Sequence, residues 1–202
     1  MPLAILGTGG HAKSIFDIVK DKKKIIFFDS KKEFFKINQK KFLVKNEKFL
    51  IKKFKTKISQ IIIAIGNNSL REKKYNLLKK NKFKFTTLIH PMAHCSLGSK
   101  IGEASVVMSG SLVNTDSIIG KNCIINSNAS IDHDCLIKDH THICPGVIIA
   151  GNVKIGKNCW IGLGSKIIQD CEIGDNVFVA AGSVVTKNIK SNSFVKGIPA
   201  KY

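Results

Sequence analysis

One short segment of the sequence concentrates side chains that could carry out acid–base chemistry. Its polar residues are Asn126, Asp132, His133, Asp134, His140 and His142. A histidine with a neighbouring carboxylate can be held in one tautomer and made more basic, as a general base requires. We therefore interpret His133 as a candidate general base, with Asp134 directly after it as the neighbouring acid. A solvated polar corner without catalytic use is the alternative that the residues alone leave open.

The element that must position His133 is indicated by a repeating hexapeptide pattern. Every sixth residue from Ile101 to Val185 is Ile or Val, without a single insertion, and a mostly small residue stands four places after each. A fixed period of six is typical of a parallel β-helix, in which each unit supplies one short strand and one corner. The branched residues fill the core and the small residues fit where the wall turns. Since Ile89 stands in phase, we expect the first coil to begin near it.

Three hexapeptide units make one coil, so residues separated by one full coil should lie side by side. Gly151 follows His133 by one full coil, which places its backbone N–H beside the imidazole as a candidate oxyanion donor. Leu163 and Ala181 are likewise one coil apart and should share one position on neighbouring coils. His133 stands two places after a core position, near a corner and outside the core.

A metal site is the alternative use of the histidines. His133, His140 and His142 occupy different phases of the period, so they project from different parts of the triangle, and no His stands one coil before or after His133. We expect no metal. The six cysteines lack a Cys-x-x-Cys pair, and four of them occupy the small in-phase position as compact apolar fillers.

Charge is distributed unevenly along the 202 residues. Residues 1–90 hold 23 Lys and Arg against 6 Asp and Glu, and residues 91–202 hold 10 against 8, within a total net charge of +19. Because Arg71 is the only arginine, a solvated lysine-rich surface is favoured over a nucleic-acid site. No apolar run approaches the ~20 residues that span a bilayer. We expect a cytoplasmic protein without membrane insertion.

The N-terminal part is interpreted as a small Rossmann-like α/β domain over residues 1–87, with the β-helix over residues 88–202. Strands are predicted at residues 3–6, 25–28, 61–65 and 83–87, and helices at residues 14–19 and 70–80, the latter capped by Asn68 or Ser69. Residues 31–57 alternate Lys with Phe and Ile, and the pattern does not decide between strand and helix.

Glycines follow the first strand in the pattern Gly-x-Gly-x-x-Ala, beginning at Gly7. Such a turn can bring backbone N–H groups and a helix N-terminus toward a phosphate. Asp29 ends the second strand and is a plausible ribose or base contact. A glycine turn without a ligand, or a nicotinamide cofactor, are the alternatives, although the domain is short for a dinucleotide.

Several motifs together resemble one family along essentially the whole chain. They are Gly-Gly-His-Ala-Lys from Gly9, Ala-Ile-Gly-Asn from Ala64, Asp-His-Asp-Cys from Asp132, Ala-Gly-Asn-Val from Ala150, Trp-Ile-Gly from Trp160 and Gly-Ile-Pro-Ala-Lys from Gly197. This combination is similar to the sugar acetyltransferases of the sialic acid O-acetyltransferase and bacillosamine or perosamine N-acetyltransferase group. The resemblance implies that the β-helix is left-handed.

The resemblance also implies a homotrimer with acetyl-CoA bound between adjacent β-helices, and roles for individual residues. His133 would be the general base and Asp134 its orienting partner. The implied substrate-binding residues are Gly9, Gly10, His11, Asp29, Ser30, Gly66 and Asn126, and those facing acetyl-CoA are His142, Gly151, Leu163 and Ala181. Two positions depart from the bacillosamine enzymes, since Asp134 replaces a glutamate and Ser30 replaces a second acid.

We expect acetyl transfer from acetyl-CoA to the amino group of a nucleotide-linked deoxyamino sugar of the UDP-4-amino-sugar type. The alternatives are O-acetylation of a sialic-acid-like sugar, a β-helix that only binds a nucleotide sugar or a partner, and a metal-dependent carbonic anhydrase. The sequence leaves the sugar and the choice among UDP, GDP and CMP open.

Overall fold

The chain consists of two compact units, Met1–Leu88 and Ile89–Tyr202. The structure, a computed structural model, describes residues 2–19 and 22–202. The sequence-predicted domain boundary lies between residues 87 and 88, directly before the division between the units.

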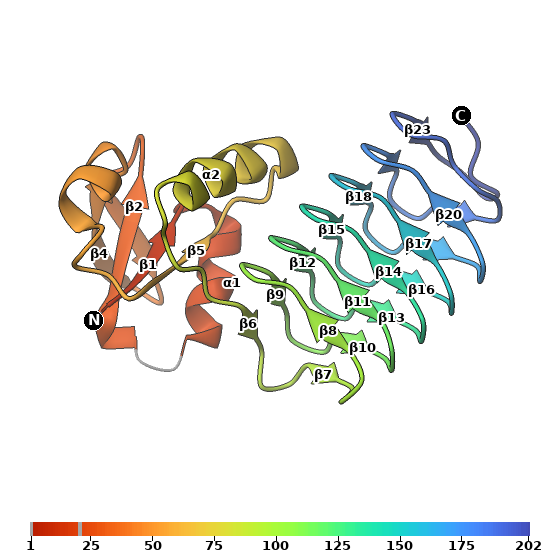
Figure 1. The fold of residues 1–202 in the computed structure, drawn as a ribbon, viewed down its shortest axis with the longest axis horizontal. Coiled ribbons are helices and arrows are strands. Elements are labelled where there is room, and N and C mark those ends of the chain that lie inside the picture. The colour runs from red at the N-terminus through yellow and green to blue at the C-terminus, as the bar shows by residue number, and fades with distance from the viewer. Residues whose placement is uncertain (1, 20–21) are drawn as a thin grey trace. The chain divides into compact units, whose positions relative to one another are not determined.

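The first unit is an α/β domain built on a five-stranded sheet of order β3-β4-β2-β1-β5 (Figure 1). Strands β4, β2, β1 and β5 are parallel, and β3 is antiparallel to β4. The strands are β1 (Leu3–Leu6), β2 (Ile25–Asp29), β3 (Phe34–Ile37), β4 (Lys40–Asn46) and β5 (Gln60–Ile63). The helices are α1 (Gly10–Ile18) and α2 (Asn68–Lys80), with a 3-10 turn at Lys22–Lys24 and a π-helix at Leu50–Phe54.

The first three predicted strands are confirmed, and residues 31–57 contain the β3–β4 hairpin and the π-helix. The strand predicted at residues 83–87 is wrong. Only Phe85 pairs there, in an isolated bridge with Ile61. Phe83 and Phe85 are both buried and stand two residues apart, which is the alternation expected of a strand. The described backbone hydrogen bonds between this segment and the sheet involve only Ile61, so no continuous ladder forms. The predicted helix cap is also wrong, because Asn67 accepts the Leu70 N–H at 2.9 Å.

The second unit is a left-handed parallel β-helix with three faces, as its period and family resemblance predicted. Figure 1 shows the coils stacked from β6 to β23. One face is a six-stranded sheet of order β22-β19-β16-β13-β10-β7, one a five-stranded sheet of order β20-β17-β14-β11-β8, and one a seven-stranded sheet of order β23-β21-β18-β15-β12-β9-β6.

Each strand of this unit is very short, because the chain turns in every hexapeptide. The strands are β6 (Leu88–Ile89), β7 (His94–Cys95), β8 (Lys100–Ile101), β9 (Val106–Val107), β10 (Leu112–Val113), β11 (Ile118–Ile119), β12 (Ile124–Ile125), β13 (Ser130–Ile131), β14 (Leu136–Ile137), β15 (His142–Ile143), β16 (Ile148–Ile149), β17 (Lys154–Ile155), β18 (Trp160–Ile161), β19 (Lys166–Ile167), β20 (Glu172–Ile173), β21 (Phe178–Val179), β22 (Val184–Val185) and β23 (Phe194–Val195).

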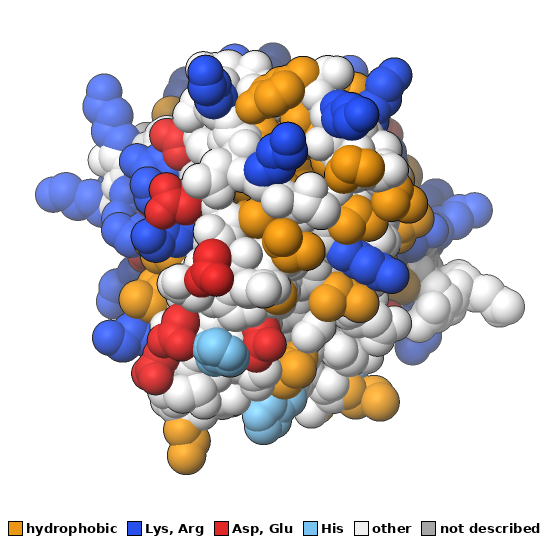
Figure 2. Space-filling view, turned by 90° about the vertical axis from the view of Figure 1, so that its right-hand side faces the viewer, with side chains coloured by type: hydrophobic (Ala, Val, Ile, Leu, Met, Phe, Trp, Pro, Cys, Tyr) orange, Lys and Arg blue, Asp and Glu red, His pale blue; other side chains and the backbone are white. Residues whose placement is uncertain are grey.

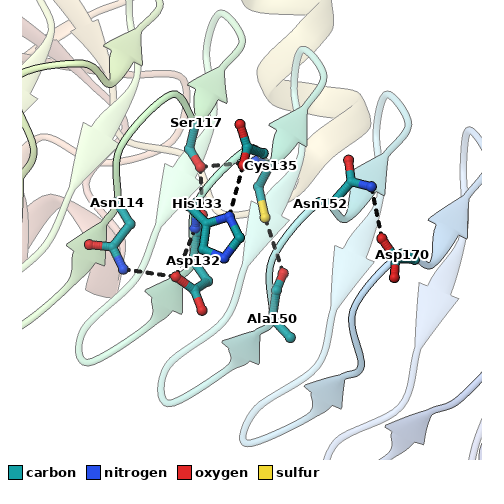
Figure 3. A network of polar contacts seen from close by, with 9 residues as sticks. Asn114, Ser117, Asp132, His133, Cys135, Ala150, Asn152 and Asp170 are labelled. Atoms are coloured by element: carbon teal, nitrogen blue, oxygen red, sulfur yellow. Dashed lines mark hydrogen bonds and ion pairs between the residues drawn. The ribbon is translucent and has the colours of Figure 1, made fainter.

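The periodic branched residues form the core of the β-helix, and each pairs with its counterpart one coil further on. Ile131 pairs with Ile149, for example, and both are buried. The small residues tie successive corners together. Ser117 accepts the N–H of Cys135 at 3.0 Å and donates its hydroxyl to the carbonyl of Asp132 (Figure 3). Backbone bonds across the coils and these side-chain bonds hold each corner in place.

Candidate active site

His133 lies on a corner between β13 and β14. We call the corner segments 132–135 and 150–153, which stack one on the other, the histidine edge. His133 Nδ1 lies 2.8 Å from Asp134 Oδ2, and the two side chains are 61% and 59% exposed. With the proton on Nδ1 donated to this carboxylate, Nε2 carries the lone pair that a base needs. The hydrogen bond to Asp134, followed by the charge of Asp132, raises the pKa of His133.

Asp132 holds the backbone of this corner. Its Oδ1 accepts the N–H of His133 at 2.8 Å and the Asn114 side-chain amide at 3.0 Å (Figure 3). These two hydrogen bonds, the one from the His133 backbone first, lower the pKa of Asp132. Asn114 was not singled out from the sequence, although its position one coil before Asp132 could have identified it.

The imidazole of His133 lies against Gly151, as their separation by one coil predicted. A Cβ atom on Gly151 would stand only 2.6 Å from Cε1 and 2.7 Å from Nε2 of His133. Glycine is therefore required for the imidazole to occupy this position.

The N–H of Gly151 is available to a ligand. Among the hydrogen bonds of the described residues, none is donated by this N–H. One coil earlier, the N–H of His133 is bonded to the Asp132 side chain, whereas the residue before Gly151 is Ala150, which has no acceptor. The arrangement thus presents a basic nitrogen and a free backbone donor side by side, the two groups that attack on a carbonyl carbon requires.

The remaining residues predicted to face acetyl-CoA lie elsewhere on the β-helix, and so does Asn126, which was predicted to bind the sugar substrate. Asn126, Leu163 and Ala181 occupy corner segments 126–129, 162–165 and 180–183, which we call the leucine edge. The Asn126 side-chain nitrogen lies 3.1 Å from His142 Nε2, on the adjoining strand β15. The His142 ring packs edge-on against Trp160 with their centroids 4.6 Å apart.

The two edges border the six-stranded sheet on opposite sides. After residue 165 on the leucine edge, the polypeptide forms β19 of the six-stranded sheet. It then reaches the corner at residues 168–171, which stacks in line with the histidine edge. Within one chain, therefore, His133, Asp134 and Gly151 lie together, whereas His142, Leu163 and Ala181 lie across the width of a sheet from them.

Large hydrophobic side chains stay exposed on and between these edges. Ile148 on β16 is 50% exposed, Leu163 is 58% exposed and Ile168 is 39% exposed. Figure 2 shows hydrophobic side chains, with lysines among them, on one side of the face it presents, beside a line of acidic side chains and histidine side chains. Exposed apolar patches are typical of surfaces that another molecule covers.

A second candidate site lies in the α/β unit, where a cavity of about 450 Å³ opens at the carboxyl ends of the parallel strands. Six residues predicted from the sequence line it: Gly9, Gly10, His11, Asp29, Ser30 and Gly66. A Cβ atom on Gly9, Gly10 or Gly66 would meet no atom within 4 Å, so their backbones face open space. Gly7 instead has φ +105° and a Cβ there would stand 2.8 Å from the Ala64 carbonyl, which only glycine accommodates.

Asp29 and His11 have contrasting surroundings in this cavity. The carboxylate of Asp29 accepts the Thr8 hydroxyl at 2.6 Å and the Thr8 N–H at 3.1 Å. Partial burial raises the pKa of Asp29, but the hydrogen bonds from Thr8 and from the following backbone outweigh it, and the pKa is lowered. Burial, and then the charge of Arg71, lowers the pKa of His11 to about 4. His11 is therefore neutral near pH 7, and its buried Nε2 makes no hydrogen bond within the described part of the chain.

The described residues contain no group of three or more His, Cys, Asp and Glu side chains placed to hold a metal ion. His140 is buried, and its Nδ1 lies 2.9 Å from the Asn122 side-chain amide. Within residues 2–19 and 22–202, none of the helices has the length and apolar character needed to cross a membrane.

A hexapeptide β-helix that carries an imidazole and an unbonded backbone N–H side by side on one edge is the arrangement expected of the hexapeptide-repeat acyltransferases. Comparison with family models agrees. Residues 2–78 match the PglD N-terminal domain, and residues 116–151 and 152–187 match the bacterial transferase hexapeptide (six repeats).

Solved structures of similar proteins cover the whole chain. Perosamine N-acetyltransferase from Caulobacter crescentus, solved with CoA and GDP-perosamine, is 30% identical, with a TM-score of 0.92 over 100% of this chain and 96% of that one. The acetyltransferase domain of PglB from Neisseria gonorrhoeae, solved with acetyl coenzyme A, is 33% identical, with a TM-score of 0.92 over 99% and 98%.

A curated relative with an N-acetyltransferase name matches a shorter part of the chain. UDP-N-acetylbacillosamine N-acetyltransferase of Bacillus subtilis is 33% identical over 112 residues, which is 53% of this chain and only 51% of that enzyme. The chain belongs to the PglD-type hexapeptide acetyltransferases, a family of acetyl-CoA-dependent nucleotide-sugar N-acetyltransferases.

Proposed function

We propose that this chain transfers the acetyl group of acetyl-CoA to the amino group of a nucleotide-linked deoxyamino sugar. The observation that carries the proposal is the contact of the His133 imidazole, oriented by Asp134, with Gly151, whose N–H is unbonded in the described structure. The relatives that use CoA and a nucleotide-linked amino sugar support the choice of substrates.

The reaction proceeds by direct attack. The neutral amine of the sugar adds to the thioester carbonyl carbon, and Nε2 of His133 takes the proton that the nitrogen loses. The carbonyl oxygen becomes an oxyanion and accepts the N–H of Gly151. When the carbon–sulfur bond breaks, the imidazolium returns its proton to the thiolate, so the products are an amide and CoA with a free thiol.

Asp134 makes this cycle possible because it fixes the proton of the neutral imidazole on Nδ1 and stabilises the imidazolium. Its φ of +59° is a left-handed conformation that Asp tolerates. The shorter Asp, in place of the Glu expected from the bacillosamine enzymes, reaches Nδ1 at 2.8 Å from this position. The departure noted in the sequence is therefore compatible with the role of the acid.

We propose further that the enzyme is a homotrimer. His133 and Gly151 lie on one edge of the six-stranded sheet, and the acetyl-CoA residues His142, Leu163 and Ala181 on the other. A closed ring of copies would set the histidine edge of one copy against the leucine edge of the next and complete the site. The exposed Ile148 and Ile168 would be buried in such an assembly.

The nucleotide half of the substrate is assigned to the cavity of the α/β unit. Backbone N–H groups at Gly9 and Gly10 and the start of α1 suit a diphosphate, and Asp29 suits the ribose or base. Cytoplasmic location is part of the proposal, supported by six cysteines that are all free in the structure.

An acceptor panel tests the function. The purified protein is incubated with acetyl-CoA and UDP-, GDP- or CMP-linked amino sugars, free thiol is measured, and the new acetyl group is located by NMR. We expect CoA release with a 4-amino sugar and an acetamido product. No release with any acceptor would indicate a β-helix that only binds its ligand, and an ester product would indicate O-acetylation.

A further inference from the structure

Arg71 is the only arginine of the chain, and it is buried, with 1% of its surface exposed. It lies in the first turn of α2, directly behind the loop that follows β5. Its guanidinium donates to the carbonyls of Ile65 at 3.1 Å and Gly66 at 3.0 Å, and to the Asn68 side-chain oxygen at 2.9 Å. A planar guanidinium with five donors can bind three oxygens at once, which a lysine ammonium cannot do in the same geometry.

The two carbonyl groups that Arg71 binds belong to residues that line the nucleotide cavity. Ile65 and Gly66 face it, whereas Arg71 is not among its lining residues. Gly66 also leaves open space where a side chain would stand. The hydrogen bonds from Arg71 therefore fix the backbone of this wall from the side opposite to the ligand.

The charge of Arg71 also acts on the cavity. Burial and this charge together lower the pKa of His11, a lining residue, to about 4. The guanidinium lowers the pKa of His11 although Arg71 does not itself line the cavity. It will also attract a diphosphate bound in the cavity, because a buried charge is weakly screened. His11 remains neutral and keeps Nε2 for a hydrogen bond to the ligand.

We propose that Arg71 is a positioning residue for the nucleotide diphosphate: it holds the backbone of residues 65–66 in the shape that receives the ligand and supplies a fixed positive charge behind it. This inference rests on the proposed nucleotide-sugar substrate. It assigns to Arg71 a role in substrate affinity and none in the acetyl-transfer step.

The test compares Arg71→Met, Arg71→Lys and Leu78→Ala in the full chain. Leu78 lies on the same helix, is 2% exposed and is not among the residues that line the nucleotide cavity, so its truncation destabilises the unit without removing a lining residue. For each variant kcat, both KM values and the unfolding temperature are measured. Arg71→Met should raise KM for the nucleotide sugar on the order of tenfold, with kcat and KM for acetyl-CoA within about twofold of wild type.

Arg71→Lys keeps the charge and loses the three-way hydrogen bonding, so its KM should lie between those of wild type and Arg71→Met. Leu78→Ala should keep the wild-type KM below its unfolding temperature. A wild-type KM in a folded Arg71→Met variant would overturn the inference, and if that variant does not fold, a wild-type KM in Arg71→Lys would do so. Failure of the wild-type protein to bind any nucleotide sugar is a different result, which contradicts the proposed function itself.

Discussion

Replacement of Gly151 by Ala should disable catalysis without unfolding the protein. The added methyl carbon would stand 2.6 Å from Cε1 and 2.7 Å from Nε2 of His133. Carbon atoms in contact prefer a separation of about 3.5–4.0 Å, so the imidazole must move by about 1 Å. The side chain of His133 is 61% exposed and free to swing outward, so the ring rather than the backbone should move.

A displacement of this size at a reacting group costs on the order of 100-fold in rate, or about 2.7 kcal/mol of transition-state stabilisation. The loss should appear in kcat/KM for acetyl transfer, measured by thiol release. The free energy of unfolding should change by no more than about 1 kcal/mol, since only a rotamer is disturbed.

Gly98→Ala is the matched control. Gly98 lies on a corner two coils before Asp134, and the nearest atom to a Cβ there would belong to the flexible Asp116 side chain, at 3.1 Å. This variant should retain wild-type kcat/KM. If Gly151→Ala keeps kcat/KM within about threefold of wild type, the contact between the imidazole and Gly151 is not the catalytic geometry.

Three further predictions concern the acid, the assembly and metals. Asp134→Asn removes the interaction that most raises the pKa of His133, so that pKa should fall. The acid limb of the pH profile of kcat/KM should then move to lower pH. An acid limb at the wild-type pH would contradict the role assigned to Asp134. His133→Ala and Leu163→Glu chains, each inactive alone, are refolded together in equal amounts. If each site combines the edges of two copies, about a quarter of the sites should regain both native residues and activity. If each site lies within one copy, the mixture should stay inactive. Treatment with a strong chelator should leave turnover unchanged, and loss of activity restored by zinc would revive a metal mechanism.

The sequence predicts the β-helix well because one physical requirement repeats at every coil. A branched side chain must fill the core at each strand, so the period persists from Ile101 to Val185 and fixes the register residue by residue. The same register places Gly151 against His133. Asn114 lies one coil before Asp132 and donates a hydrogen bond to its side chain. The same register could therefore have predicted this contact from the sequence.

The secondary structure of the α/β unit is less predictable from the sequence because tertiary contacts, rather than a repeating pattern, determine it. Phe34 is 46% exposed while Phe35 is buried, so apolar residues occur on both faces of β3 and the period is obscured. The helix cap is Asn67, whose side chain accepts the Leu70 N–H, whereas Asn68 already lies within the helix and accepts a hydrogen bond from Arg71. The role of Arg71 depends on where its guanidinium points, and the sequence shows only that a single arginine follows a glycine loop.

In the proposed mechanism, His133 is the base that activates the acceptor amine. The most direct test is kcat/KM of His133→Ala with acetyl-CoA and the preferred nucleotide-linked amino sugar, beside wild type. Removal of the base should lower kcat/KM by about 100-fold or more, with KM for both substrates little changed. Near wild-type turnover by a folded His133→Ala enzyme would contradict the mechanism.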